Sequence, residues 1–274
     1  MTTKRLDTPG STPDPESVTP GDEHDVVIVD ARRRLLVLAA MCIALVAGVA
    51  SVSGLNVAQQ ALATDLGATQ SQLLWIINGY TLVLAALLMP VGAIGDRWGR
   101  KPILLIGFVV FSLSNLASAF STEPTTLIGL RVLAGVGAAM IMPVTLSVIT
   151  TSFPREEQAK AIGTWAGFAG AGGIIGLFVS AAIIDNATWP WVFALPIALA
   201  AISFVLTIAF VPHSVEHTEA GFDVAGSILS AVAVGGLVLA FHEGPEQGWN
   251  APITVAALAA GIIGAAVFVA VELR

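Results

Sequence analysis

Ionisable side chains gather in one short stretch of the chain, Gly92-Ala-Ile-Gly-Asp96-Arg97-Trp98-Gly99-Arg100-Lys101-Pro102. One acid and three bases lie within six positions there, between two apolar runs that are each about as long as a membrane span. The simplest interpretation is a loop whose positive charge fixes orientation in a membrane. The alternative is a conformational latch, in which ion pairs join neighbouring segments and glycines let their backbones approach. Asp96 and the glycine spacing favour the latch, because a positive loop requires neither.

Arg131 is the second candidate, because it is a cation inside an apolar run at about residues 125–149. It lies about six residues, roughly 9 Å at the helical rise, from the outer end of that run. A cation at this depth is costly and by default functional, and it requires a polar partner. Counted from the same end, Ser51 and the only tyrosine, Tyr80, lie at nearly the same depth. Two simpler alternatives remain: Arg131 extends to the lipid head groups, and Tyr80 is merely packed.

Glycines at helical spacing form a third pattern between residues 163 and 176. Small residues on one helix face let two helices approach closely in lipid. Two interpretations explain this spacing equally well: static packing of the helices, and a surface on which two helix bundles rock. A weaker version of the pattern follows Arg131 by one turn. The candidate packing positions are Gly135, Gly137, Gly163, Gly167, Gly170, Gly173 and Gly176.

These side chains must be positioned by membrane-spanning helices. The chain is 55% hydrophobic and only 11% charged, against about 25% charged residues in soluble domains. Uncharged runs near the roughly 20 residues that a bilayer requires recur after residue 34. The sequence therefore predicts an all-α, polytopic helical membrane protein. The expected spans are about 35–58, 73–95, 102–120, 125–149, 161–184, 189–211, 224–242 and 251–271.

Basic residues predict the orientation of these spans. With a cytoplasmic N-terminus, the expected external connections contain no Lys or Arg, whereas the cytoplasmic side carries nearly all of them. Four tryptophans then fall at the outer interface, where such rings are enriched. The cytoplasmic bases are Lys4, Arg5, Arg32, Arg33, Arg34, Arg97, Arg100, Lys101, Arg155, Lys160 and Arg274, and the tryptophans are Trp75, Trp189, Trp191 and Trp249.

The first 31 residues differ from the rest of the chain. Residues 1–30 hold seven acids and two bases, so they contribute −5 of the net charge of −7. An acidic tail rich in Pro, Ser and Thr is typical of disorder, and we expect a disordered cytoplasmic tail over 1–31. The single Cys42 lies inside a span and excludes an intrachain disulfide framework. No metal site, cofactor or nucleic-acid partner is expected.

The assembled pattern resembles the major facilitator superfamily, and within it the fourteen-helix drug:proton antiporter branch. The motif from Gly92 to Lys101 sits between the second and third spans, as in the family, and Arg131-x-x-x-Gly135-x-Gly137 is similar to its fourth-helix motif. The resemblance implies a six-span N-terminal bundle at 32–211, then a connection and two linking helices at 212–274. A second six-helix bundle is expected beyond residue 274, so the chain would be the N-terminal part of a longer transporter.

Three positions depart from the pattern of that branch. Ser51 stands where the branch usually has a first-helix aspartate, and Ala134 stands where it has a glutamine. The fifth-helix motif, normally Gly-Pro-x-x-Gly-Gly, reads Gly176-Leu-Phe-Val-Ser-Ala181 here. Within the first six spans no acid lies deep enough to carry a proton, so any carrier is missing, lies beyond residue 274 or lies near Glu243.

The resemblance implies secondary transport across the plasma membrane: efflux of an apolar or amphiphilic small molecule, with protons as the candidate coupling ion. A facilitator or symporter of an organic anion held by Arg131 is the alternative, and a non-transporting sensor is a remote one. No His-Glu-x-x-His helix occurs and no histidine lies deep in a span, which argues against an enzyme, and the absence of a Walker loop argues against transport driven directly by ATP. The expected latch is Gly92, Asp96, Arg97, Gly99, Arg100 and Lys101; the expected cavity residues are Ser51, Asn56, Tyr80, Arg131 and Trp165.

Overall fold

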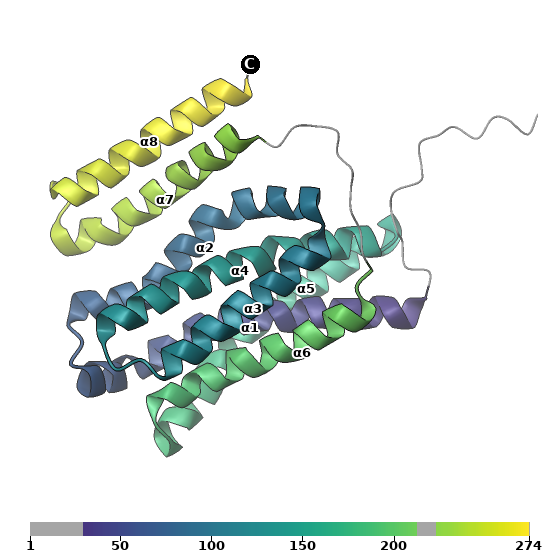
Figure 1. Ribbon diagram of the computed structural model, residues 1–274, viewed down its shortest axis with the longest axis horizontal. Helices are drawn as coiled ribbons and strands as arrows, with labels where there is room; N and C mark the ends of the chain where they lie inside the picture. The colour runs from purple at the N-terminus through teal and green to yellow at the C-terminus, as the bar shows by residue number, and fades with distance from the viewer. Residues whose placement is uncertain (1–29, 213–222, 274) are drawn as a thin grey trace, which may run out of the picture.

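The computed structural model describes residues 30–212 and 223–273, and these residues fold as helices joined by short connections (Figure 1). Eight helices are long and apolar enough to cross a membrane, which confirms the predicted all-α membrane fold. They are α1 (Ala31–Leu66), α2 (Gln70–Trp98), α3 (Arg100–Ala119), α4 (Pro124–Ser152), α5 (Arg155–Asn186), α6 (Ala194–Phe210, which spans together with the short helix before it), α7 (Val224–Gln247) and α8 (Pro252–Glu272). A short 3₁₀ helix, η1 (Trp189–Phe193), leads into α6.

Several helices extend well beyond the apolar runs that predict them. The first is 36 residues long, whereas its apolar run suggests a span at about 35–58. It ends at Gly67, whose φ of +62° is the left-handed conformation that stops a helix. Only three residues later α2 begins with a capping box between Thr69 and Gln72. The polar residues in this region therefore continue or cap helices instead of forming a loop.

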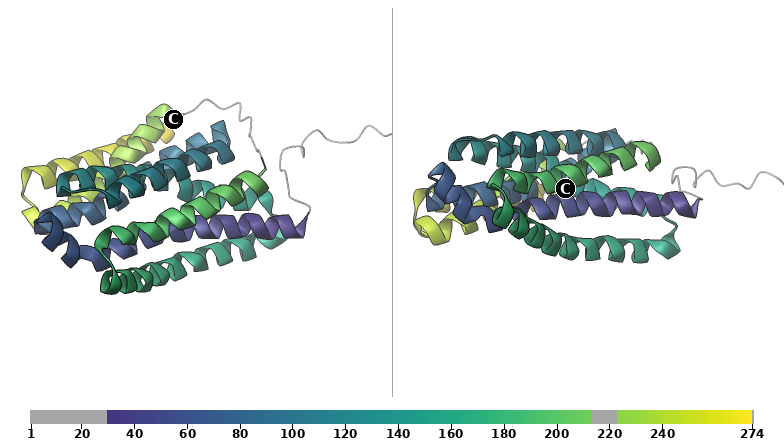
Figure 2. Two further views of the ribbon diagram at one scale, coloured as in Figure 1. Left: turned by 60° about the horizontal axis from the view of Figure 1, so that its bottom comes forward. Right: turned by 90° about the horizontal axis from the view of Figure 1, so that it is seen from below.

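The first six helices pack as one bundle, with α1 at its centre (Figures 1 and 2). It packs along α5 and α6 and also contacts α4, while α4 packs against α2 and α3. The remaining two helices form a pair in which α7 lies against α2 and α8 lies against α7. The α7–α8 pair therefore joins the bundle through α2.

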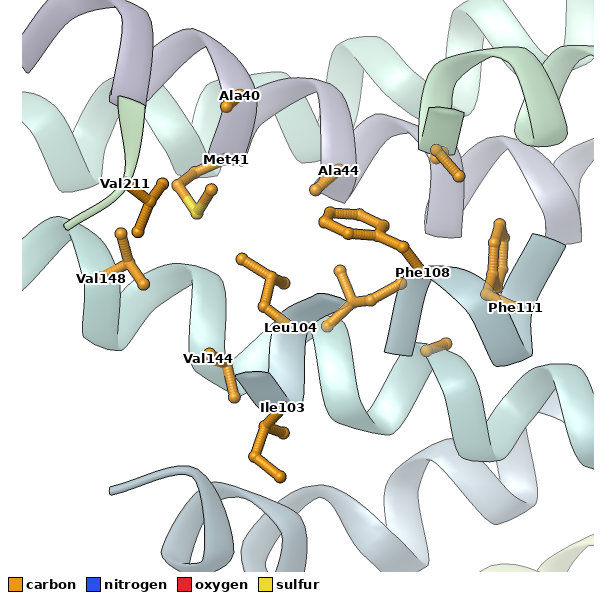
Figure 3. Packing of buried hydrophobic residues seen from close by; sticks show 14 of the residues in the cluster. Ala40, Met41, Ala44, Ile103, Leu104, Phe108, Phe111, Val144, Val148 and Val211 are labelled. Carbon is orange, nitrogen blue, oxygen red and sulfur yellow. The ribbon is translucent and has the colours of Figure 1, made fainter. Parts of the chain in front are cut away.

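Apolar side chains from α1, α3 and α4 fill the interior of one half of the bundle (Figure 3). Met41 on α1, Leu104 and Phe108 on α3 and Val148 on α4 belong to this cluster and are at most 2% exposed. A second cluster fills the other half and includes Leu62 and residues of α2, α4 and η1. Small residues between the helices let these clusters form: a Cβ at Gly137 would lie 2.6 Å from the backbone nitrogen of Phe111.

The glycines of α5 do not share a single packed face. Gly176 lies against α1, where a Cβ would come within 2.6 Å of Ala50 Cα. A Cβ at Gly163, Gly167 or Gly170 would meet no atom of another element within 4 Å. The predicted glycine series therefore divides into a packed part near α1 and an open part further along the helix. The expected disordered tail and most of the 212–223 connection lie outside the described residues.

Candidate functional site

Arg131 on α4 is completely buried inside the six-helix bundle. Its Nη1 donates to Ser51 Oγ on α1 at 2.9 Å and to Asn115 Oδ1 on α3 at 3.3 Å. Its Nε donates to the carbonyl oxygen of Ile76 on α2 at 3.4 Å. A planar group with five N–H donors is able to make such divergent bonds at once. One guanidinium therefore ties α4 to α1, α2 and α3.

Tyr80 on α2 completes the surroundings of Arg131. The centre of its ring lies 4.6 Å from the Arg131 Cζ, which is a cation–π distance. Its hydroxyl donates to the carbonyl oxygen of Gly48 on α1 at 3.1 Å, so the buried phenol is satisfied. Gly135 allows this approach, since a Cβ there would lie 2.6 Å from the Tyr80 carbonyl oxygen. The ring and the hydroxyl thus connect α2 to both α4 and α1.

The groups that surround Arg131 are neutral. None of the ion pairs seen in residues 30–212 and 223–273 includes it, and its Nη2 has no hydrogen-bond partner among those residues. Hydrogen bonds to neutral oxygens and the ring face offset part of the desolvation cost of the cation. Because arginine stays protonated in proteins, this cluster holds helices together and does not exchange a proton.

Asn115 is a member of this cluster that the sequence reasoning missed. It is fully buried; its Oδ1 accepts from Ser51 at 3.1 Å and from Arg131, and its Nδ2 donates to the Phe111 carbonyl oxygen at 2.8 Å. The signal was available in the sequence, because Asn115 is the only asparagine within the expected span 102–120. A buried amide in such a span requires hydrogen-bond partners.

The five expected cavity residues do not form one surface. Ser51, Tyr80 and Arg131 meet in the packed interior, at no more than 2% exposure. Asn56 is exposed on α1, and its amide nitrogen donates to a carbonyl oxygen of the same helix. Trp165 on α5 is partly buried and lies elsewhere, with its Nε1 bonded to a threonine of α4 at 3.2 Å.

The charged stretch at 96–101 is a helix junction and not a loop. Asp96 and Arg97 belong to the last turn of α2, and Arg100 and Lys101 belong to the first turn of α3. Gly99 alone separates the helices, with a φ of +99° that favours glycine. Both helices continue to the junction, and one glycine reverses the chain between them.

Asp96 is the centre of this junction. Its Oδ1 accepts from Arg100 Nε on α3 at 3.3 Å and from Ser147 Oγ on α4 at 3.0 Å. The neighbouring Gly95 brings α2 close to α4, since a Cβ there would lie 2.9 Å from a methyl group of Val144. A Cβ at Gly92 would lie 3.6 Å from the Cβ of Pro143 on α4, which is an ordinary van der Waals distance. One carboxylate thus joins the ends of three helices.

The remaining bases near this end of the bundle bond to other elements or lie exposed. Lys101 Nζ donates to the carbonyl oxygens of Ile208 at 2.9 Å and Val211 at 2.8 Å, at the end of α6. Arg33 Nε of α1 donates to the Phe210 carbonyl oxygen at 3.0 Å. Cations at a helix C-terminus satisfy its unpaired carbonyl groups. Arg97, by contrast, is exposed.

A pocket of about 410 Å³ lies at the same end, between α1 and α5. Arg34, Glu157 and Lys160 contribute charged groups to its lining, and Arg34 pairs with Glu157 at 3.4 Å. Within residues 30–212 and 223–273 no group of three or more His, Cys, Asp or Glu side chains is arranged to hold a metal ion.

The sequence profile of the Major Facilitator Superfamily matches residues 36–273. The chain belongs to this family. Major facilitator proteins are transporters and not enzymes, and this chain is a multi-pass membrane protein related to drug-resistance efflux pumps. Its fold agrees with a crystal structure of an auto-inhibited POT family peptide transporter, at a TM-score of 0.62 and 14% identity over 85% of this chain and 51% of that one.

Two relatives illustrate how the major facilitator chain compares with curated proteins. It is 35% identical to the methyl viologen resistance protein SmvA of Salmonella typhimurium over 181 residues, which are 66% of this chain and 37% of SmvA. It is 35% identical to the multidrug efflux pump LfrA of Mycolicibacterium smegmatis over 209 residues, which are 76% of this chain and 41% of LfrA. The chain therefore spans less than half the length of these relatives.

Proposed function

We propose that this chain is the N-terminal helix bundle of a secondary transporter that exports apolar or amphiphilic small molecules in exchange for protons. The observation that carries the proposal is the junction at Asp96. A carboxylate that joins the ends of α2, α3 and α4 through single hydrogen bonds is suited to a gate, because such bonds break when the helix ends separate. SmvA and LfrA, whose names describe resistance and efflux, support export as the direction.

The surface of α5 supports the proposal that the substrate is apolar. No charged residue occurs between Ala161 and Ile184, and large apolar side chains such as Phe168, Ile174 and Phe178 are exposed along it. Cavities for drug-sized molecules are mostly apolar with a few polar groups. We propose that the open face of α5, with its glycines, borders the transport path and meets a second helix bundle of the transporter.

A dye-transport experiment tests this function. The protein is expressed from its complete natural gene, and uptake of a fluorescent cationic dye is followed in inverted membrane vesicles with and without an imposed proton gradient. We expect uptake that stops when a protonophore collapses the gradient. Uptake that is insensitive to the protonophore would contradict proton antiport, and absence of uptake for a panel of amphiphilic dyes would contradict export of such molecules.

Transport of an organic anion through Arg131 has weaker support. The unpartnered Nη2 is in its favour, but the side chain is 0% exposed and its other donors are occupied. A substrate would have to separate the helices to reach it. If Arg131→Lys and Arg131→Ala both retain transport of every substrate tested, Arg131 is structural and the anion hypothesis is wrong.

A further inference from the structure

A second group of buried polar side chains lies away from Arg131, where α7 packs against α2. Glu243 on α7 is only 1% exposed, and its neighbour His242 is 10% exposed. The His242 Nε2 and the Glu243 Oε1 face each other at 3.8 Å. Among the described residues neither of these two atoms has a hydrogen-bond partner. A buried carboxylate and a buried imidazole thus face each other across a gap slightly longer than a hydrogen bond.

The other atoms of the pair are held in place. The side-chain amide of Asn78 on α2 lies 3.1 Å from His242 Nδ1, and the ring of Trp75 on α2 packs edge-on against the imidazole at 5.2 Å between ring centres. The Gln247 amide donates to the Glu243 Oε2. If the Asn78 amide donates to Nδ1, the ring proton of a neutral His242 sits on Nε2, toward the Glu243 carboxylate. The two unpartnered atoms are therefore oriented by contacts with α2 and with the next turn of α7.

No other charged group faces this pair from the described parts of the packed elements. The ionisable residues of α2 are Tyr80, which turns toward Gly48, and Asp96 and Arg97, which lie at the opposite end of the helix. Residues 252–271 of α8 contain none. On α7, Glu246 is exposed. With a neutral imidazole and an ionised carboxylate, the pair carries one net negative charge inside an apolar contact, and one added proton removes it.

We propose that His242 and Glu243 form a binding site for one proton at the contact between α7 and α2. A proton enters from the partly exposed edge of His242. It gives either an imidazolium, with Nδ1 protonated and the Asn78 amide turned so that its oxygen accepts, or a Glu243 carboxylic acid that donates to Nε2 of the other imidazole tautomer. Because a net charge is unfavourable in an apolar contact, the bound proton strengthens the packing of α7 on α2. Its use in driving transport rests on the proposed antiport function; the site itself does not.

Infrared difference spectroscopy tests the site directly. The protein from its complete gene is purified, placed in lipid nanodiscs and stepped between pH 8 and pH 5, about the range in which imidazoles and perturbed carboxylic acids titrate. We expect a carbonyl band of a protonated, poorly hydrated carboxylic acid to appear at low pH, or imidazole bands of a histidine that protonates beside a carboxylate. Either signal should be lost in Glu243→Gln and retained in Glu246→Gln, which removes an exposed carboxylate three residues away on the same helix.

The outcomes separate the site from the transport function. Retention of the wild-type signal in Glu243→Gln, or absence of any signal in the wild type, overturns the proposed site. If Glu243→Gln does not fold, His242→Asn replaces it: we expect a changed midpoint pH, and an unchanged midpoint overturns the site. Vesicle uptake is measured in parallel: a wild type without gradient-driven uptake contradicts antiport alone, whereas gradient-driven uptake that Glu243→Gln loses and Glu246→Gln keeps supports both.

Discussion

Ser51 is a small side chain that forms hydrogen bonds to buried polar groups on two other helices. Its hydroxyl accepts from the buried Arg131 and donates to Asn115, so it links α1 to both of these residues. Ser53, two residues later, bonds only to a carbonyl oxygen one turn back in the same helix. The two serines therefore form a natural pair for comparison.

We expect Ser51→Ala to lower the free energy of unfolding by about 1–3 kcal/mol, because it leaves a buried N–H of Arg131 without a partner and removes one of the two hydrogen bonds that Asn115 Oδ1 accepts. Ser53→Ala should change stability by less than about 0.5 kcal/mol, as for substitutions away from such networks. Thermal unfolding of the purified protein in detergent, followed by intrinsic tryptophan fluorescence, measures both. Equal effects of the two variants would contradict a shared role for Ser51 and Arg131.

Asp96 illustrates a charge whose role is not stability. Its side chain is 51% exposed, so its ion pair with Arg100 contributes only about 0–1 kcal/mol to folding. Asp96→Asn keeps an acceptor for Ser147 but removes the charge. We expect transport in the vesicle assay to fall severalfold, while the amount of protein in the membrane, measured through a fluorescent fusion, stays the same. Asp185→Asn, an exposed acid at the far end of α5, serves as the control.

Unchanged transport in Asp96→Asn would contradict the latch. Equal losses in Asp96→Asn and Asp185→Asn would point instead to a general effect of surface charge.

For single residues, the sequence predicts the depth in the membrane better than the helix face on which the side chain lies. Counting along the spans places Ser51, Tyr80 and Arg131 at one level, and the structure brings them together. The sequence places Asn56 with them, but five residues along a helix correspond to about 140° of rotation, so Asn56 lies on a different face of α1 from Ser51. Trp165 has a partner on α4 that no spacing rule identifies. The depth of a residue follows from its distance to the ends of its span. The helix face that meets other helices depends on how those helices pack, which a single sequence does not reveal.

At the scale of elements, the α2–α3 junction places charges against the local helix dipoles. Asp96 lies near the negative C-terminal end of α2, and Arg100 and Lys101 lie at the positive N-terminal end of α3, where each is disfavoured. Partners on other elements offset this: Asp96 bonds to Ser147 of α4, and Lys101 bonds to the last carbonyl groups of α6. The junction is therefore stable only when the helices around it are docked.

The two parts of the α5 glycine series should respond differently to a methyl group. Gly176→Ala places a Cβ 2.6 Å from Ala50 Cα of α1, so we expect a loss of about 1–3 kcal/mol of stability through overpacking. Gly167→Ala meets no neighbour and should gain up to about 1 kcal/mol from helix propensity. Thermal unfolding in detergent measures both variants. Destabilisation by Gly167→Ala of the size seen for Gly176→Ala would show that the open part is also packed.

At the scale of the whole molecule, the sequence predicts the number and order of the helices because bilayer thickness dictates the length of each apolar run. Their ends were harder to predict. Helix α1 has 36 residues, or about 54 Å at the helical rise, far more than the roughly 30 Å hydrocarbon core. A polar sequence such as Gln59-Gln60 resembles a loop to a hydropathy count but continues the helix in the structure.

The orientation of the molecule remains a prediction and has a direct test. Cys42 is buried, and Cys42→Ala leaves a background free of thiols. In that background Thr122→Cys, exposed between α3 and α4, should react with a membrane-impermeant maleimide on intact cells. Arg155→Cys, exposed at the start of α5, should react only after the cells are opened. The reverse pattern would contradict a cytoplasmic N-terminus, and labelling of both on intact cells would invalidate the predicted topology.

The central position of α1 also has a consequence in time. Helix α1 leaves the ribosome before α2 to α8, yet the partners of Ser51 follow 64 residues later, at Asn115, and 80 residues later, at Arg131. At the usual synthesis rate of roughly 5–20 residues per second, Arg131 follows by about 4–16 s. Its packing neighbours α5 and α6 are made later still. Helix α1 must therefore stay in the bilayer for seconds before its packing partners are synthesised. During this time chaperones or the insertion machinery are able to bind it.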